Sequence, residues 1–387
     1  GGPVDAWAME ASRKLDALRA PLPPPAPSRA EEADGLLRQW ADAATTAPDA
    51  AVLPDIRRFG RFYSAILDLI EVARGDGRRG VARAVGTLLA ADRALAALNY
   101  SQADDLAARV QATVGTSQSP LWLWAERARL NAAFNSGHGA QVWGRAERLA
   151  AAAAAQGLDA LEADARHRLG GLHYTSGSYE RAVAEYQRAL TLRMNLGATR
   201  GVVSSRLALG DGLDKLGREA EAWEEYLRIL TASGVDDQSL LTVLLNGVSL
   251  HALEQGFENT VVALEHEAAR HATGVHNGIL ATALYYEARA LVRLGRTAEA
   301  QHALSRSRDL VSALPDPSMQ ERYAADFAQA EADVLAVTSP ADAIPVLADA
   351  RRRLLGVNAR QRLLALTVDQ GTGHRPPRRR VSGARCS

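Results

Sequence analysis

Cysteine, aromatic side chains and long apolar runs are all scarce in this sequence. Of its 387 residues one is a cysteine, Cys386, so no disulfide can form within the chain, and a reducing compartment is expected. No run of about 18 or more apolar residues, the length that a membrane-spanning helix needs, occurs in it, and the first residues do not resemble a secretory leader. These absences predict a soluble, cytoplasmic protein without a membrane partner.

Net charge is absent too. Lys and Arg total 45, Asp and Glu also total 45, and the formal net charge is therefore +0. Without an overall field the chain has no general attraction for nucleic acid, so an electrostatic partner has to recognise a local patch. Hydrophobic residues make up 47% of the chain and aromatic residues only 5%, and much of the apolar fraction is alanine, the best helix former. This composition predicts an all-α protein.

Glycines mark the same point in five successive copies of one pattern. The clearest copies, LGGLHYTSGSYERAVAEYQRAL from Leu169 and LGDGLDKLGREAEAWEEYLRIL from Leu209, both read as helix, short turn, helix. A unit of this size cannot bury its apolar face alone, so the copies are expected to stack into one elongated body. By subtraction the spacings are 40, 40, 39 and 39 residues for Gly137, Gly177, Gly217, Gly256 and Gly295.

Apolar periodicity predicts further helices on both sides of the clearest copies. Less regular helices are expected first, at 30–46, 55–74, 78–97 and 101–114, and a last pair at 318–337 and 341–355. Between them lie five better pairs, at 121–136 and 139–155, 160–175 and 179–195, 201–216 and 219–232, 239–255 and 258–273, and 277–294 and 297–312.

These helices divide the chain into five parts. Five prolines between Pro21 and Pro27 favour an extended linker, and the arginines near the C-terminus lie in a stretch without apolar periodicity. The arginine-rich tail either meets phosphates or acidic proteins or is a solvated end without a role. The parts are an N-terminal helix and proline-rich linker at 1–29, degenerate repeats forming an N-terminal cap at 30–120, five helix pairs at 121–312, a degenerate C-terminal pair at 313–370 and a disordered basic tail at 371–387.

Small and aromatic side chains recur at fixed places within the copies. Gly170 and Ala182 fall where two helices are expected to cross most closely, and Gly177 follows a helix, where a left-handed backbone suits glycine. The pattern resembles the tetratricopeptide repeat, although Arg166 stands where that family more often has a large apolar residue. The residues that carry the resemblance are Gly170, Tyr174, Gly177, Ala182, Tyr186 and Ala189.

The resemblance implies a right-handed α-α superhelix, a solenoid of stacked antiparallel helix pairs. It is strong over 121–312, weak over 55–120 and 318–355, and absent elsewhere. The period of about 40 residues exceeds the 34 residues usual in the family. The longer period resembles that of members found in bacterial regulatory and sensor proteins.

One glycine motif suggests nucleotide chemistry at first sight. Residues Gly75 to Gly80 read GDGRRG and satisfy G-x-G-x-x-G, a fingerprint that needs a preceding strand to aim a helix N-terminus at phosphates. The preceding residues, FYSAILDLIEVAR, have helical apolar spacing instead. We therefore expect a turn between helices here and no cofactor site.

The histidines suggest a metal site only weakly. His266, Glu267 and His271 resemble a zinc helix, but the histidines are five residues apart, which places them roughly 140° apart around a helix. We expect these histidines to be solvated. The alternative is a metal cluster that also includes His251 and His276. No nucleophile lies in a recognisable catalytic setting, so the sequence predicts no catalytic, cofactor-binding or metal-binding residue and no enzyme.

The resemblance implies that first helices line a concave groove. Positions spaced 3, 4 and 3 along such a helix share one face, and aromatic rings beside polar groups there suit an extended peptide. We expect Trp124, Tyr285 and Arg289 at the surface, whereas Phe134 and Tyr174 could equally pack between helices. The predicted partner-binding residues are Trp124, Arg127, Asn131, His167, Tyr174, Asp211, Asp214, Asn246, Tyr285, Tyr286, Arg289 and Arg293.

The functional hypothesis is a noncatalytic interaction scaffold or regulatory sensor arm that binds a peptide or protein in this groove. Self-association is a further option, and specific nucleic-acid binding is not expected. The alternative from another class is a small-molecule-sensing repeat domain of a bacterial signalling or transcriptional regulator. An enzyme with an unrecognised site is the third hypothesis, which would need a closed pocket that a regular array does not promise.

Overall fold

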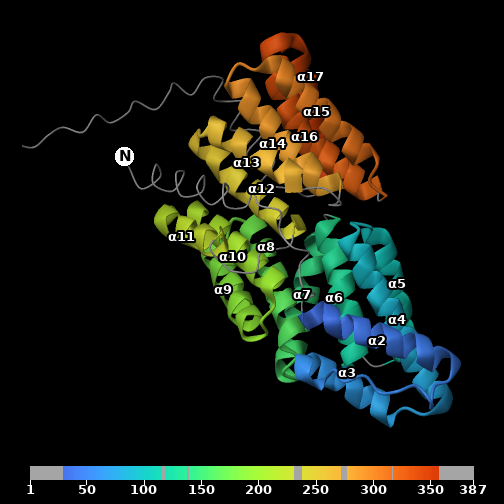
Figure 1. Ribbon diagram of the computed structural model, residues 1–387. Helices are drawn as coiled ribbons and strands as arrows, with labels where there is room; N and C mark the ends of the chain where they lie inside the picture. The colour runs from blue at the N-terminus through green and yellow to red at the C-terminus, as the bar shows by residue number, and fades with distance from the viewer. Residues whose placement is uncertain are drawn as a thin grey trace, which may run out of the picture.

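The computed structural model describes residues 29–115, 118–136, 139–230, 238–271, 277–315 and 317–356. Within these ranges every regular element is a helix, so the predicted all-α solenoid of stacked helix pairs is confirmed (Figure 1). None of the helices in these ranges is both long enough and apolar enough to cross a bilayer. The predicted N-terminal helix, proline-rich linker and basic tail lie outside the described residues.

The helices agree closely with the predicted ranges. Four precede the regular array: α2 (Arg29–Thr46), α3 (Arg61–Val72), α4 (Gly75–Ala96) and α5 (Tyr100–Val114). Six pairs follow: α6 (Pro120–Asn135) and α7 (Gly139–Ala155), α8 (Asp159–Thr175) and α9 (Tyr179–Asn195), α10 (Thr199–Lys215) and α11 (Glu219–Leu230), α12 (Gln238–Gln255) and α13 (Glu258–His271), α14 (Asn277–Arg293) and α15 (Thr297–Ser312), and α16 (Pro317–Thr338) and α17 (Pro340–Gly356).

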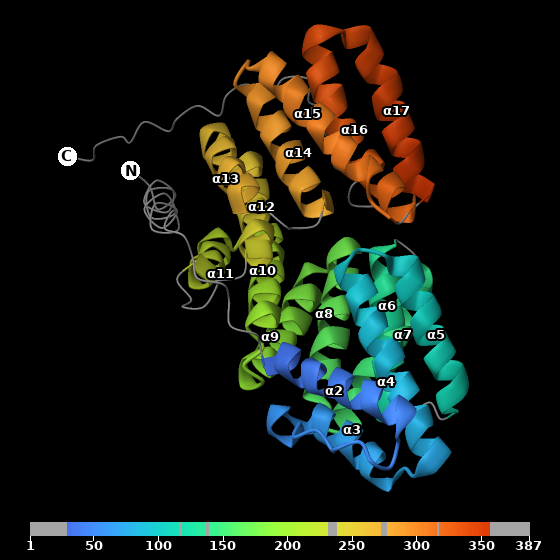
Figure 2. The ribbon, with the colours of Figure 1, turned by 45° about the vertical axis from the view of Figure 1, so that its right-hand side comes forward.

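The array is packed more tightly on one side than on the other. Each first helix from α4 to α16 contacts the next first helix, whereas consecutive second helices of the described chain make no comparable contact. Closer spacing of the first helices bends the stack so that they lie on the inside of its curve, as Figures 1 and 2 show. We call the side formed by α6, α8, α10, α12, α14 and α16 the inner face.

Glycine occupies the positions where the repeat pattern requires it. The turns between first and second helices contain Gly177, Gly217, Gly256 and Gly295, all with φ between 73° and 81°, a left-handed conformation that strains other residues. Gly137 lies outside the described residues. At the predicted close crossing, a Cβ atom on Gly170 would lie 2.5 Å from the Tyr186 ring. The expected close approach of the two helices is therefore confirmed.

Two N-terminal predictions are wrong in detail. The helix expected at 55–74 is broken, because a short 3-10 helix (Arg57–Phe59) ends at Gly60, whose φ of 116° interrupts the helix before α3 begins. The motif from Gly75 to Gly80 is the first part of α4 rather than a turn. Helix formation can start at Gly75 because its backbone N–H donates to Asp49 Oδ1 at 3.0 Å, which satisfies a helix N-terminus from a distant segment.

Helix α3 is the one element that leaves the stacking pattern. It packs against α6 and α8, both first helices, and thereby covers the N-terminal end of the inner face. The ring of Phe62 lies 5.2 Å from that of Trp124 in an edge-on arrangement, which joins the two segments through buried aromatic surface. The part of the inner face that remains uncovered by α3 begins at α10.

Candidate functional site

Ionisable side chains of the inner face gather in two clusters. The first lies near the N-terminus and joins five helices, namely α2, α4, α6, α8 and α9. Arg127 Nη2 donates to Asp92 at 2.5 Å and Arg127 Nη1 lies 3.6 Å from Asp164, which also accepts from Arg193 Nη2 at 2.9 Å. We call Asp34, Asp92, Arg127, Asp164 and Arg193 the N-terminal charge cluster.

Four of these charges, those of Asp92, Arg127, Asp164 and Arg193, compensate one another. Burial opposes ionisation, but Arg193 and Arg127 hold the pKa of Asp164 below its usual value. Burial likewise opposes the Arg127 cation, yet Asp92 and Asp164 raise its pKa. Paired buried charges of this kind fix the relative position of helices, because removing one partner leaves the other uncompensated. Arg127, a predicted binding residue, therefore holds helices together.

Trp124 is buried, contrary to the prediction that it lies at the surface. Only 1% of the residue is exposed, and its indole N–H donates to Asp92 Oδ2 at 2.8 Å. The reason is the unexpected position of α3, whose Phe62 covers the indole. A partner cannot reach Trp124 while α3 occupies this place.

Asp34 is the member of the N-terminal charge cluster whose negative charge is least stabilised by its surroundings. Burial, together with the nearby charge of Asp92, raises the pKa of Asp34 to about 6, although the Tyr63 hydroxyl donates to its Oδ1 at 3.1 Å. Below pH 4 the carboxyl is protonated in folded and unfolded chains alike. Between about pH 4 and pH 6 the unfolded chain loses this proton while the folded protein keeps it, so stability falls as pH rises through this window.

We therefore expect Asp34→Asn to stabilise the protein by about 2 kcal/mol at pH 8 and much less at pH 4.5. The amide oxygen still accepts from Tyr63, whereas the cost of burying a charge disappears. Urea unfolding at both pH values measures the effect. The neighbouring change Asp92→Asn is the control and should destabilise at pH 8, because Asp92 is the partner of Arg127. An equal gain from Asp34→Asn at both pH values would contradict the assignment.

Asn131 and His167 lie between the two clusters. Asn131 Oδ1 accepts from Arg168 Nε at 2.5 Å, and the guanidinium of Arg168 stacks 4.9 Å above the ring of Phe134. His167 lies 3.4 Å from the Ser204 hydroxyl through Nε2, and burial together with Arg193 and Arg168 holds its pKa well below the usual value. His167 is therefore a neutral ring, and the charge of the neighbouring Arg168 is buried between Asn131 and Phe134.

The second cluster lies at the middle of the array, where α10 meets α12. Both nitrogens of His251 face carboxylates: Nε2 is 3.7 Å from Asp211 and Nδ1 is 3.7 Å from Asp214. Lys215 Nζ donates to Glu254 Oε2 at 2.8 Å and to Asp214 Oδ2 at 3.4 Å. We call Asp211, Asp214, Lys215, His251 and Glu254 the central acidic cluster, since its three carboxylates outnumber its one lysine.

Aromatic rings surround the central acidic cluster. The Tyr226 hydroxyl donates to Asp211 Oδ1 at 2.8 Å, and the Tyr226 ring lies 4.9 Å from that of His251. Tyr174 approaches from α8, where burial and then the charges of Asp211 and Glu254 raise its pKa. Burial also raises the pKa of Asp211 itself. A cationic group of a ligand placed beside Asp211 would therefore stabilise the charged form of this carboxyl.

Three members of the cluster could hold a metal ion. Ligand atoms of Asp214, His251 and Glu254 all lie within 4.8 Å of one another. An ammonium group already stands among them, because Lys215 contacts both carboxylates. A divalent cation held by these three ligands would have to displace Lys215.

The third group of predicted residues lies on α14, and its exposure was wrongly predicted. Tyr285 is 8% exposed and stacks on Phe327 with ring centroids 5.0 Å apart. Arg289 is largely buried and donates to Asp333 Oδ2 at 3.1 Å. The cause is α16, which brings Phe327 and Asp333 against this face. Tyr286 packs beside Tyr285 at 5.1 Å.

Two further predicted residues bind backbone. Arg293 Nη1 donates to the carbonyl of Leu253 at 2.7 Å, and Asn246 Nδ2 donates to that of Ile279 at 3.0 Å. Asn246 is 7% exposed, so it ties α12 to α14 and is not open to a partner. Arg293 is 41% exposed and stays available at its outer end.

His251 and Glu254 are the residues that the sequence pattern missed. The spacing of 3, 4 and 3 that selects Asn246 also selects Leu250 and Leu253, and we call the positions selected in this way the predicted stripe. His251 and Glu254 each lie one position after a member of this stripe. The expectation of a solvated His251 is wrong, since it is 5% exposed. Of the other predicted histidines, His266 lies 2.7 Å from Glu287, while the His271 side chain and His276 are outside the described residues. The predicted stripe brings Tyr174, Asp211 and Asp214 together at the central acidic cluster and leaves the α6 and α14 residues in separate groups.

Comparison with known proteins gives a likeness of fold. No protein-family model and no curated protein sequence matches the chain. Among solved structures, the apo form of the quorum sensor NprR from B. thuringiensis has a TM-score of 0.50 and 13% identity, over 87% of this chain and 97% of that one. A Rap protein complexed with Competence and Sporulation Factor has a TM-score of 0.40 and 12% identity, over 94% of this chain and 97% of that one. At such identities the likeness to NprR supports the repeat fold alone.

Proposed function

We propose that this protein is a noncatalytic regulatory scaffold that binds a peptide or protein segment along its inner face, and that the central acidic cluster receives a cationic group of that segment. The observation that carries the proposal is the accessible negative charge at the middle of the inner face. Side chains of Asp211 and Glu254 are 33% and 42% exposed there. A lysine or arginine side chain, or an N-terminal ammonium group, is the matching ligand group.

The surroundings of the cluster favour a peptide ligand. Tyr174 is half-buried beside the acids and Trp223 lies 6.2 Å from His251, so flat apolar surface adjoins the charges. Rings next to polar groups bury ligand area at low entropic cost, which is typical of peptide recognition.

A regulatory role is supported by the fold and by the chemistry of the cluster. NprR, which has a similar fold, is described as a quorum sensor, so this architecture serves signal reception in at least one protein. Within the cluster each acid already contacts a tyrosine, histidine or lysine. Charges arranged in this way suit recognition, and we assign them no catalytic step.

Selection of peptides from a random library on the immobilised protein tests the proposal. Enriched peptides are expected to contain lysine or arginine and to bind the double variant Asp211→Asn with Glu254→Gln about tenfold more weakly, a loss of about 1.4 kcal/mol. Binding to the unchanged protein should weaken as salt is added, because the acids are partly exposed.

A matched control separates the cluster from overall charge. Glu221→Gln with Glu299→Gln makes the same change in net charge at exposed acids of the second helices, each paired with a nearby arginine. This control should leave affinity unchanged. Enriched peptides without basic residues, or equal losses in both double variants, would contradict the role of the cluster.

A further inference from the structure

Leu98 is the most unusual backbone position in the described chain. It is the one non-glycine residue there with positive φ, 58°. Leu98 precedes Gly137 by 39 residues and thus continues the glycine series by one more period. The turn between α4 and α5 therefore places a leucine where later turns place glycine.

The hydrogen bonds confirm that the turns are equivalent. Leu98 N donates to Leu95 O at 3.0 Å and the next residue, Asn99, donates to Ala94 O at 2.8 Å. In the later turn Gly177 N donates to Tyr174 O at 3.1 Å, and the residue after it repeats the second bond. The turn geometry thus imposes a left-handed conformation on a leucine, which strains its backbone.

The side chain lies where the two ends of the array meet. Leu98 is half-buried and packs against an apolar cluster that unites Tyr100 and Ala103 of α5 with Leu291 of α14 and Leu314, which follows α15. Figures 1 and 2 both show the α4–α5 end beside the ends of the C-terminal helices.

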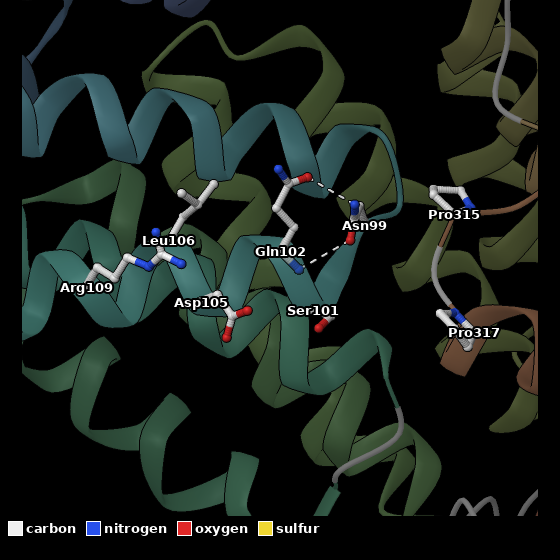
Figure 3. A pocket seen from close by; sticks show the side chains of 8 residues that line it. All are labelled: Asn99, Ser101, Gln102, Asp105, Leu106, Arg109, Pro315 and Pro317. Atoms are coloured by element: carbon white, nitrogen blue, oxygen red, sulfur yellow. Dashed lines mark hydrogen bonds between the residues drawn. The ribbon is translucent and has the colours of Figure 1, made fainter.

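A pocket of about 390 Å³ adjoins the same contact. Asn99, Ser101 and Gln102 line it from one side, and Pro315, which follows α15, and Pro317, the first residue of α16, line it from the other (Figure 3). Its walls come from both ends of the array, so the pocket exists only while the ends are together.

Few other contacts join these parts of the molecule. In the described chain, α2 to α7 share no extensive helix-packing interface with α12 to α17. The two parts are otherwise connected through α8 to α11. Small changes of angle between successive repeats add up along such an array and change its overall opening. A contact between the ends fixes that opening directly.

We propose that the α4–α5 turn is a clasp, in which Leu98 holds the N-terminal half against the C-terminal half and keeps the inner face closed. The clasp is a conformational device separate from the peptide site. Opening it would expose the apolar surface of Leu98 and its neighbours, whereas the hydrogen bonds that set the left-handed conformation lie within the turn and would remain. A ligand that binds the open form better than the closed form would therefore shift the protein toward the open form.

Distance measurement between two spin labels tests the clasp. In the full chain with Cys386→Ser, labels are attached through Ala112→Cys on α5 and Asp309→Cys on α15, both exposed positions. The parent should give one narrow distance distribution. Leu98→Gly should shift that distribution to longer and broader distances while the protein stays folded, because glycine fits the turn.

Two further variants make the outcome decisive. Leu314→Ala weakens the clasp from its other side and should broaden the distribution in the same way. Gly177→Leu introduces the same strain at a turn where an added Cβ atom meets no atom within 4 Å, and should lower stability without changing the distance. An unchanged distribution for Leu98→Gly, or a broad one for the parent, would overturn the proposal.

Discussion

Replacing Trp124 by alanine is expected to destabilise the protein by about 4 kcal/mol. The indole is among the largest fully buried side chains of the described core, and its removal leaves a cavity between α3, α4 and α6. It also removes a hydrogen-bond donor from Asp92, whose remaining partner is Arg127. Urea unfolding followed by circular dichroism measures the loss.

The same substitution at Trp143 is the control for the loss of an indole. Trp143 is half-buried and donates to Glu147 on its own helix at 3.0 Å. Trp143→Ala should cost less than half as much as Trp124→Ala. If Trp124→Ala left stability unchanged and abolished peptide binding instead, Trp124 would be a surface residue after all and α3 would not cover it.

Adding a single methyl group at Gly210 is expected to destabilise the protein by about 3 kcal/mol. A Cβ atom there would lie 2.4 Å from Tyr226 Cε1. Tyr226 cannot withdraw, because it is 1% exposed and its hydroxyl is bound to Asp211. Relief of the clash has to separate α10 from α11. Urea unfolding of Gly210→Ala measures the cost.

Gly86→Ala is the matched control and should have the opposite sign. Gly86 lies inside α4, and an added Cβ meets no atom within 4 Å. Without a clash, alanine stabilises a helix relative to glycine by about 0.5–1 kcal/mol. Two glycine-to-alanine changes in helices would thus differ by about 4 kcal/mol, which measures the close approach itself. Equal effects would contradict the packing of Tyr226.

The repeat determines what could be predicted. Helix bounds such as Tyr179–Asn195 and Thr297–Ser312 coincide with the sequence predictions, because apolar period and glycine position both mark them. Gly170 was correctly assigned to a close crossing for the same reason. In a solenoid each helix packs mainly on its sequence neighbours, so local pattern largely specifies tertiary contact.

Contacts outside the repeat register could not be predicted. Helix α3 folds back onto α6 and α8, and the pairing of Phe62 with Trp124 leaves no periodic signal in the sequence. Likewise, the burial of Arg289 depends on Asp333 of the next pair, 44 residues later, which belongs to a degenerate copy. The spacing of residues along a helix shows which of them share a face. It does not show which other segment of the chain covers that face.

Two of the five residues of the central acidic cluster were predicted. Asp211 and Asp214 follow from the stripe on α10, whereas His251 and Glu254 fall one position beyond the stripe on α12. Neighbouring helices are offset as they pack, so residues that meet across a helix pair need not occupy equivalent positions. The sequence alone does not contain that offset.

The placement of α3 also sets a length for what can bind. Since this helix already covers α6 and α8, the free inner face runs over four first helices, from α10 to α16. At an interaxial distance of about 9 Å the three intervals between them span about 27 Å. An extended chain advances about 3.4 Å per residue, so a segment of about eight residues would reach from one end of this free stretch to the other.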